Sequence, residues 1–162
     1  MRSQRSCSAG GEYTGNFVLE VAGLTLTAAD DADRPTLIAA DTTNPNNQNV
    51  PLLLVQTGIT VSHIDIVLGP LNEDLGQRDL GVFVTPNASD ATLSGVTIHR
   101  DGSRLGMEPA EGPGSRGVLV FVADGVAIEG CEVTGPWQDG IHLPSVNTAV
   151  RAQWFPNRYK VS

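Results

Sequence analysis

The sequence has very little of the positive charge that nucleic-acid-binding proteins carry. Lysine occurs once, at Lys160, and the ten basic residues face 18 acidic ones, which gives a net charge of −8 and a pI of about 4.6. Such a chain repels phosphate backbones, so nucleic acid is excluded as a partner. The acidity has two interpretations. One is random drift, and the other is a secreted, halophilic protein whose surface carboxylates keep it solvated in high salt.

Cysteines and long apolar runs are also scarce. Cys7 and Cys131 are the only cysteines, and no metal-binding spacing is present, so no metal site is predicted from them. The strand pattern puts Cys131 at an inward position, which favours a buried free thiol, while a Cys7–Cys131 disulfide stays open. No run of ~18 apolar residues exists, which excludes a transmembrane helix. Met1–Gly11 has no apolar centre and therefore does not read as a signal peptide.

Glycine and proline, by contrast, are plentiful, with 18 and 10 residues. Between Gly117 and Leu143 they separate three short strands of period two, with tight corners at Asp124-Gly125 and Glu129-Gly130. No helical period is present. The same unit recurs upstream, and its second strand carries equivalent apolar residues at Leu26, Val61, Leu93 and Ile128. This recurrence is typical of a parallel β-solenoid, whose stacked coils share one core.

The alternation predicts which side chains face the interior. The first strand of successive coils supplies the pairs Leu52/Leu54, Val82/Val84, Val118/Val120 and Ile141/Leu143. The coils are longer than the ~20–25 residues that a minimal coil needs, and the excess follows the third strand in each middle repeat. The fold class is therefore predicted to be all-β, a parallel β-helix of about four coils with loops inserted on one flank, where they can wall a groove.

The same pattern divides the chain into three parts. Residues 11–147 are predicted to form the β-helix domain, after a disordered leader at 1–10 and before an irregular tail or cap at 148–162. A fragment of a longer solenoid is the alternative. Uncovered terminal coils expose unpaired strand edges, so self-association through the solenoid ends is predicted.

Three stretches carry a resemblance to a known family. The run GEYTGNFVLEVAGLTLTAADDADRPTLI and the later GVTIHRDG and GVAIEGCEVTG resemble coils of the pectate-lyase-like, right-handed parallel β-helix superfamily, which includes NosD-like and PbH1-repeat proteins. The resemblance spans about residues 11–147. It implies a right-handed helix, an extracellular or cell-surface location and polysaccharide as the partner. It does not select an activity, because the superfamily holds lyases, hydrolases, epimerases, esterases and adhesins.

Superfamily enzymes act through carboxylates, arginines and histidines on the outer face of the solenoid. The candidates here for catalysis are Asp101, Asp139, Arg100 and His142, and the candidates for substrate binding are Trp137, Arg104, Arg78 and His99. Glycoside hydrolysis needs two carboxylates about 5–10 Å apart, which Asp101 and Asp139 would supply from adjacent coils. A lyase or epimerase would instead need a base near an arginine or Ca²⁺ that neutralises a uronate carboxylate.

Each candidate also has a structural interpretation. Asp139 and Asp101 both precede glycine and are typical turn residues, and Trp137 suits packing as well as sugar stacking. The segment QDGIHL resembles the NTDGID-type segment of polygalacturonase-like hydrolases, but the companion motifs of that family are absent. Cofactors are predicted to be none, with Ca²⁺ left open because Asp30, Asp31 and Asp33 share one corner.

Two functions therefore stand side by side. The favoured one is a secreted or cell-surface β-helix domain that presents a polysaccharide-binding face, with catalysis unassigned. The alternative is a polysaccharide lyase or glycoside hydrolase, or a fragment of one, that acts on acidic polysaccharide.

Overall fold

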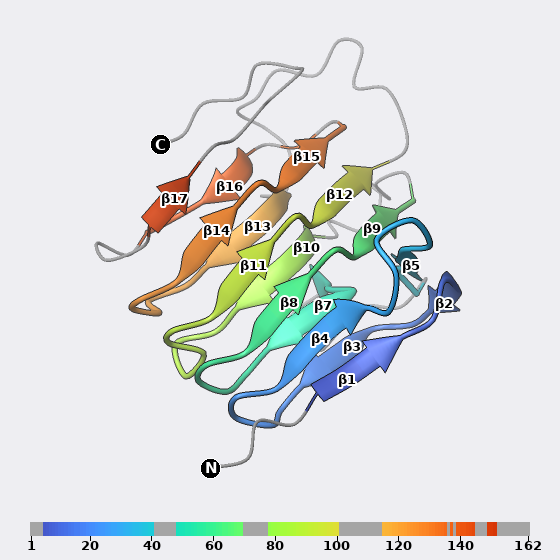
Figure 1. Cartoon of the computed structure of the whole chain (residues 1–162). Coiled ribbons are helices and arrows are strands. Elements are labelled where there is room, and N and C mark those ends of the chain that lie inside the picture. Colours follow the sequence, from blue (N-terminus) through green and yellow to red (C-terminus); the bar gives the residue numbers. More distant parts are fainter. Residues whose placement is uncertain are drawn as a thin grey trace, which may run out of the picture.

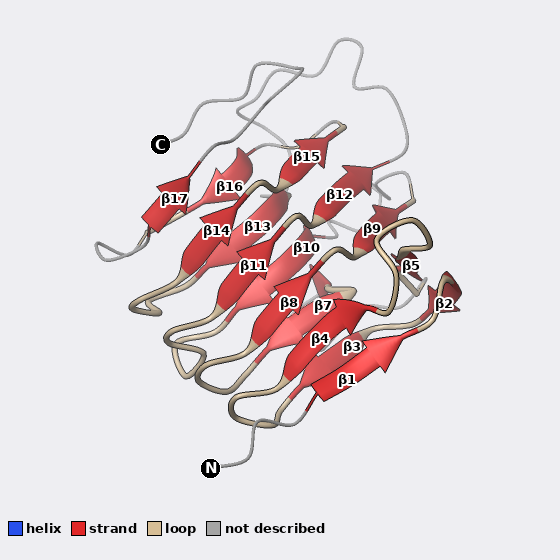
Figure 2. Cartoon of the chain, in the orientation of Figure 1, coloured by secondary structure: helices blue, strands red, loops and turns tan. Residues whose placement is uncertain are grey.

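The computed structural model describes residues 5–40, 48–69, 78–100, 115–135, 137, 139–144 and 149–151. These residues form short strands and turns, which are stacked in regular tiers (Figures 1 and 2). The described residues include no helix, and thus no helical span long and apolar enough to cross a membrane.

The strands fall into three parallel sheets, which we call A, B and C. Sheet A consists of β1 (Arg5–Ser8), β4 (Thr25–Ala28), β8 (Thr60–Ser62), β11 (Thr92–Ser94), β14 (Ala127–Glu129) and β17 (Ala149–Arg151). Sheet B consists of β2 (Gly11–Thr14), β5 (Pro35–Ile38), β9 (Asp65–Leu68), β12 (Thr97–Arg100) and β15 (Glu132–Thr134). Sheet C consists of β3 (Phe17–Leu19), β7 (Leu52–Leu54), β10 (Arg78–Val84), β13 (Arg116–Val120) and β16 (Asp139–His142), and β6 (Gln48–Asn49) pairs with β10.

The chain visits the three sheets in turn, and each strand pairs in parallel with its equivalent one coil away. This topology confirms the predicted parallel β-helix. The coils β3-β4-β5, β7-β8-β9, β10-β11-β12 and β13-β14-β15 are the four expected ones, with β1 and β2 below them and β16 and β17 above. The insertions at 41–47, 70–77 and 101–114 all join a strand of sheet B to the next strand of sheet C, as predicted.

Two strands lie outside the predicted domain limits. Arg5–Ser8, within the leader expected to be disordered, pairs with Thr25–Ala28, and Ala149–Arg151, within the expected tail, pairs with Ala127–Glu129. Parallel pairing uses backbone groups alone, so a short polar strand such as RSCS joins a sheet without an apolar alternation that the sequence would reveal.

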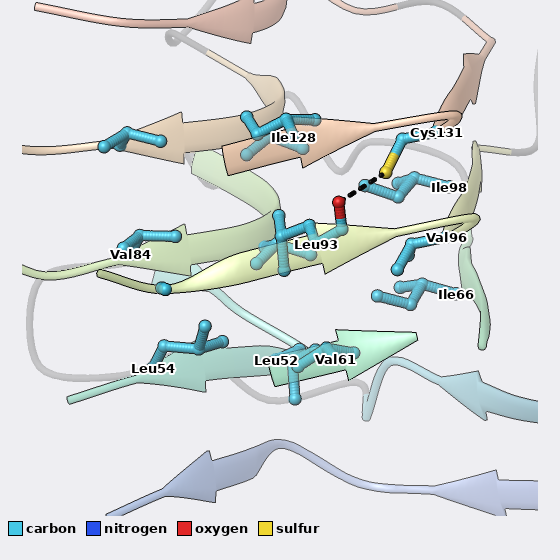
Figure 3. Close-up of a cluster of buried hydrophobic side chains, with 14 of the residues drawn as sticks. Leu52, Leu54, Val61, Ile66, Val84, Leu93, Val96, Ile98, Ile128 and Cys131 are labelled. Carbon is cyan, nitrogen blue, oxygen red and sulfur yellow. Dashed lines mark hydrogen bonds between the residues drawn. The ribbon is translucent and has the colours of Figure 1, made fainter. Parts of the chain in front are cut away.

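The core consists of aliphatic columns that run through the coils (Figure 3). In sheet A, Val61, Leu93 and Ile128 lie in register and are fully buried. Sheets B and C supply matching columns, which include Ile66, Ile98 and Val133 and Val82, Val118 and Ile141. At about 1.5–3 kcal/mol for each buried side chain, these columns are the main source of stability.

Cys131 lies in this core as a free thiol, as the alternation predicted. Its Sγ is 3.6 Å from the carbonyl oxygen of Leu93, to which it donates a weak hydrogen bond (Figure 3). Burial raises the pKa of the Cys131 thiol above its ordinary value, which keeps the sulfur protonated and unreactive at neutral pH.

The corner between sheets A and B uses the same backbone conformation in three successive coils. His63, Gly95 and Gly130 have φ angles of 54°, 59° and 58°, in the left-handed region. A Cβ at Gly95 would lie 2.8 Å from Cδ2 of His63, so the partly exposed imidazole (43%) would have to shift to admit it. The two-residue corners that the sequence predicted are therefore built from one left-handed residue each.

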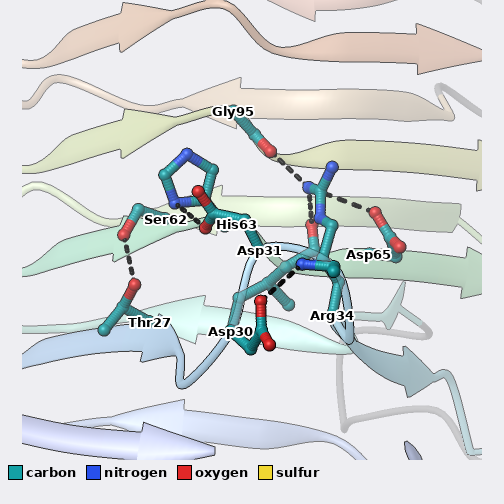
Figure 4. A network of polar contacts seen from close by, with 10 residues as sticks. Thr27, Asp30, Asp31, Arg34, Ser62, His63, Asp65 and Gly95 are labelled. Carbon is teal, nitrogen blue, oxygen red and sulfur yellow. Dashed lines mark hydrogen bonds and ion pairs between the residues drawn. The ribbon is translucent and has the colours of Figure 1, made fainter. Parts of the chain in front are cut away.

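A loop at residues 29–34, which we call the corner strap, reaches across this corner (Figure 4). Arg34 donates through Nη2 to the carbonyl oxygens of Ile64 and Gly95, and the same nitrogen lies 3.2 Å from Asp65 Oδ1. Asp31 Oδ1 lies 3.1 Å from His63 Nδ1. The strap thus ties the first full coil to the two coils above it.

Candidate functional site

The outer face of sheet C carries a column of apolar side chains. Equivalent positions of five successive strands hold Val18, Leu53, Phe83, Leu119 and, at the upper end, the polar His142. They alternate with the core residues of the same strands and therefore point away from the interior. Leu53, Phe83 and Leu119 form a second apolar cluster with Val50 and Leu80, separate from the main core. We call Val18, Leu53, Phe83 and Leu119 the outer column.

His142 stands at the upper end of the outer column and belongs to a polar cluster. Its Nδ1 lies 3.1 Å from Asp139 Oδ2, and Arg116 donates a hydrogen bond of 3.2 Å from Nε to the same oxygen. Arg116 and Asp139 are paired positions of β13 and β16. The side chains of Arg116, Asp139 and His142 are 22%, 16% and 27% exposed, so the cluster is partly exposed to solvent.

The imidazole of His142 lies close to the carboxylate of Asp139 without a hydrogen bond between them. Nδ1 of His142 is buried, and its contact with Asp139 has the distance of an ion pair without the angle of a hydrogen bond. The contact therefore does not fix the tautomer of the ring. The cluster brings an imidazole, a carboxylate and a guanidinium together in one place.

Two other candidates meet inside the molecule rather than on its outer face. Arg100 occupies an inward position of β12, where it is 1% exposed and forms an ion pair with Asp79. Its guanidinium carbon lies 4.9 Å from the ring centre of Trp137, which is also 1% exposed. Trp137 donates from Nε1 to the carbonyl oxygen of Thr134 at 2.8 Å.

This arrangement decides how the two residues can act. A sugar ring cannot stack on an indole that Arg100 already covers, so Trp137 has the packing role that the sequence offered as an alternative. Arg100 extends from the strand position that Leu68 fills in the coil below, and it was expected on the outer face. Its inward direction follows from the period-two alternation, because Arg100 is two residues after the buried Ile98.

The remaining candidates are scattered. His99 is exposed on the outer face of sheet B, where its Nδ1 lies 2.9 Å from Thr134 Oγ1. Arg78 begins strand β10, but its side chain is outside the described part of the structure. Asp101 and Arg104 lie outside the described residues, so the proposed pairing of Asp101 with Asp139 stays a prediction.

Within the described residues, no group of three or more acidic, histidine or cysteine side chains is arranged to hold a metal ion. Two of the three aspartates considered for Ca²⁺ have other partners. Asp30 accepts a hydrogen bond of 2.9 Å from the Ala32 amide, and Asp31 contacts His63. The Ca²⁺ prediction is thus left without a described ligand set.

Sequence reasoning missed Arg116 and the partner role of Asp79. A signal for Arg116 was present, because Arg116 precedes Val118 by two residues as Asp139 precedes Ile141, and Val118 and Ile141 were already aligned. The signal for Asp79 was weaker. Asp79 follows a polar, glycine-containing stretch, which is typical of a loop, whereas it lies in β10 and is 2% exposed.

No protein-family model matches this chain, and no curated protein matches it. Among solved structures, the chain is similar to a candidate glycosyl hydrolase from Parabacteroides merdae. The two share 13% sequence identity and a TM-score of 0.50, over 94% of this chain and 82% of that one. At this identity the likeness shows a common fold and nothing finer.

Proposed function

We propose that this chain is a β-helix domain of a secreted or cell-surface protein that binds polysaccharide along the outer face of sheet C. The observation that carries the proposal is the outer column, in which Val18 is 51% exposed and Leu53 and Phe83 are partly exposed. The buried Leu119 (8% exposed) lies between these residues and the cluster of Arg116, Asp139 and His142. Binding sites for organic ligands combine mostly apolar surface with a few placed polar groups. A linear polysaccharide offers the C–H faces of its rings to such a column and its polar groups to the cluster.

Two further points support this reading. The equivalent positions of adjacent coils are spaced about 4.8 Å apart, so Val18, Leu53 and Phe83 offer repeated contacts to a repeating polymer. The solved structure with a similar fold is a candidate glycosyl hydrolase, a class of enzyme that acts on carbohydrate. Membership of the pectate-lyase-like superfamily fits both points and is part of the proposal.

A second candidate function is favoured by the contact between Asp139 and His142. A histidine is the commonest general base in enzymes, and here it lies beside a carboxylate and the Arg116 cation. These groups suit a polysaccharide lyase or glycoside hydrolase that acts on acidic polysaccharide. The net charge of −8 opposes the approach of polyanions, and for this reason we place binding first.

Affinity electrophoresis in gels that contain one polysaccharide each tests the binding proposal. The panel includes neutral polymers such as xylan and acidic ones such as polygalacturonate and alginate. The expected result is retardation by at least one polymer. In the variant Phe83→Ala we expect about tenfold weaker binding, because the substitution removes an apolar contact of ~1.4 kcal/mol.

Thr92→Ala is the matched control, since Thr92 lies on the outer face of sheet A. It should bind as the natural chain does. Equal binding by Phe83→Ala and the natural chain, or no retardation by any polymer, would contradict the proposal. Release of reducing sugar, or of unsaturated product that absorbs in the ultraviolet, would favour the enzymatic candidate.

A further inference from the structure

The corner that joins β10 to β11 carries a motif that the proposed function does not use. It reads Asn87-Ala88-Ser89, the Asn-x-Ser pattern to which N-linked glycans are attached in secreted proteins, and the chain contains this pattern once. The pattern has this meaning only on a surface loop, because the asparagine amide has to reach the enzyme that modifies it. The structure meets this condition, since Asn87 is exposed and Ser89 is partly exposed.

The asparagine lies in a tight turn. The Ala88 amide donates a hydrogen bond of 2.9 Å to the Thr85 carbonyl oxygen, and Pro86 and Asn87 are the two exposed residues between them. Proline presets φ at the first central position of such a turn, and asparagine is one of the residues that turns favour. A group attached to Asn87 Nδ2 would therefore extend into solvent without disturbing the paired strands.

The coil above presents exposed apolar side chains beside this turn. Phe121 and Val122, in the corner that joins β13 to β14, are 47% and 60% exposed. The Phe121 amide donates to the Val84 carbonyl oxygen, and the Asp90 amide donates to the Asp124 carbonyl oxygen. The two corners are thus bonded at both ends and lie side by side (Figure 1).

Register places Asn87 beside Val122. The bond from the Asp90 amide pairs Asp90 with Gly125, and both residues have left-handed φ angles, of 58° and 68°. Counting back three residues in each corner pairs Asn87 with Val122, at the spacing of about 4.8 Å between coils. Val122 has a φ of 56°, a conformation that glycine or asparagine adopts with less strain than a β-branched residue. An exposed apolar side chain is thus present where the backbone does not call for one.

We propose that Asn87 carries an N-linked glycan whose first sugars cover Phe121 and Val122. The inference rests on the proposed function in one respect, because it needs a chain that is exported. In the transfer, Asn87 Nδ2 forms a bond to the anomeric carbon of a lipid-linked oligosaccharide. The bond from that carbon to the lipid diphosphate breaks, and a base of the transferase takes the amide proton. The C–H faces of the sugars then remove apolar side-chain area from water.

The closed corner sets the order of transfer and folding. Ala88 is fully buried, and the Ser89 carbonyl oxygen accepts hydrogen bonds of 2.9 Å from Thr57 Oγ1 and from the Gly58 amide. The middle of the motif is thus held against the coil below, so the glycan has to be added before the corner closes. Membranes that contain the transferase should modify a synthetic peptide of residues 79–100 and not the folded chain. Equal modification of both would overturn this order.

Mass spectrometry of the chain recovered from outside the cells that produce it tests the proposal. Trypsin cleaves after Arg78 and Arg100 and releases the peptide 79–100, in which Asn87 is the sole asparagine. We expect this peptide to carry the added mass of an oligosaccharide. The added mass should be lost in Asn87→Gln and in Ser89→Ala, and it should be kept in the matched control Ser89→Thr, which retains the hydroxyl.

Thermal unfolding tests whether the sugars cover the corner. Enzymatic removal of the glycan should lower the Tm of the natural chain by about 2–4 °C, the shift expected for one lost apolar contact in a chain of this size. In Phe121→Ser the same treatment should leave Tm unchanged. Tyr13→Ser is the matched control, because Tyr13 is an exposed aromatic residue (38%) on sheet B, and here the treatment should lower Tm as in the natural chain.

The outcomes separate this inference from the binding proposal. An unmodified Asn87 in the exported chain would overturn the inference and leave polysaccharide binding intact, since affinity electrophoresis needs no glycan. A chain found only inside the cell would overturn both the glycan and the secreted location, whatever the gels show. A loss of Tm that is equal in the natural chain and in Phe121→Ser would show that the sugars do not cover this corner.

Discussion

At the scale of single residues, the outstanding feature is a charge inside the solenoid. Arg100 takes an inward position that aliphatic side chains fill elsewhere, and it is accommodated by the carboxylate of Asp79 and the ring of Trp137. Removing one member of a buried pair leaves the other charge desolvated, which costs much more than the intact pair contributes.

We therefore predict that Asp79→Ala lowers the free energy of unfolding by ~3–5 kcal/mol, as measured by urea denaturation. The double variant Asp79→Leu with Arg100→Met should recover most of this loss, because neither charge is then buried. Asp65→Ala breaks the partly exposed pair of Arg34 (27% exposed) and Asp65 (33% exposed). It should lower the free energy of unfolding by at most ~1 kcal/mol. Equal effects of Asp79→Ala and Asp65→Ala would show that the interior pair is hydrated.

At the scale of strands, the close approach of sheets B and C depends on glycine at the start of the sheet C strands. A Cβ on Gly117 would lie 2.3 Å from Val133 Cγ1 and 2.5 Å from the carbonyl oxygen of Gly140. The second contact is with backbone, so relief requires the coils to move apart. Gly81 has the same relation to Gly117, with a distance of 2.5 Å to its carbonyl oxygen.

Gly117→Ala should consequently destabilise the chain by about 1–3 kcal/mol or more, which is the cost of overpacking a filled core. Thermal unfolding followed by circular dichroism measures the effect. Gly69→Ala is the control, because no atom lies within 4 Å of a Cβ built there. If Gly117→Ala is as stable as Gly69→Ala, the spacing between sheets B and C is not set at this position.

At the scale of the whole molecule, the sequence predicted the coil order and the core columns because one physical rule generates both. Alternation with period two repeats in every coil, so Val61, Leu93 and Ile128 reveal their alignment without any tertiary information. The candidate site was less predictable. Asp139 and His142 were identified from local sequence, but their contact with Arg116 depends on strand register. The inward direction of Arg100 was overlooked because a charged residue was assumed to face solvent.

The overall charge leads to the last prediction. With 18 acidic and 10 basic residues, repulsion within one chain should exceed the gain from partly exposed pairs such as Arg34 with Asp65, worth ~0–1 kcal/mol each. Salt weakens both the repulsion and the ion pairs, so the sign of its effect on the urea midpoint shows which of the two is larger. Because the repulsion is expected to be larger, the urea midpoint should rise steadily as KCl is raised from ~0.1 M to ~1 M. Such a rise is what adaptation to high salt requires.

The measurement should be made at one fixed, low chain concentration, since any self-association would add its own concentration-dependent stabilisation. Sucrose at matched osmolality serves as the control for effects that do not involve charge. A midpoint that falls with KCl would mean that the ion pairs of the corner strap outweigh the repulsion, and the acidic surface would then have no role in salt tolerance.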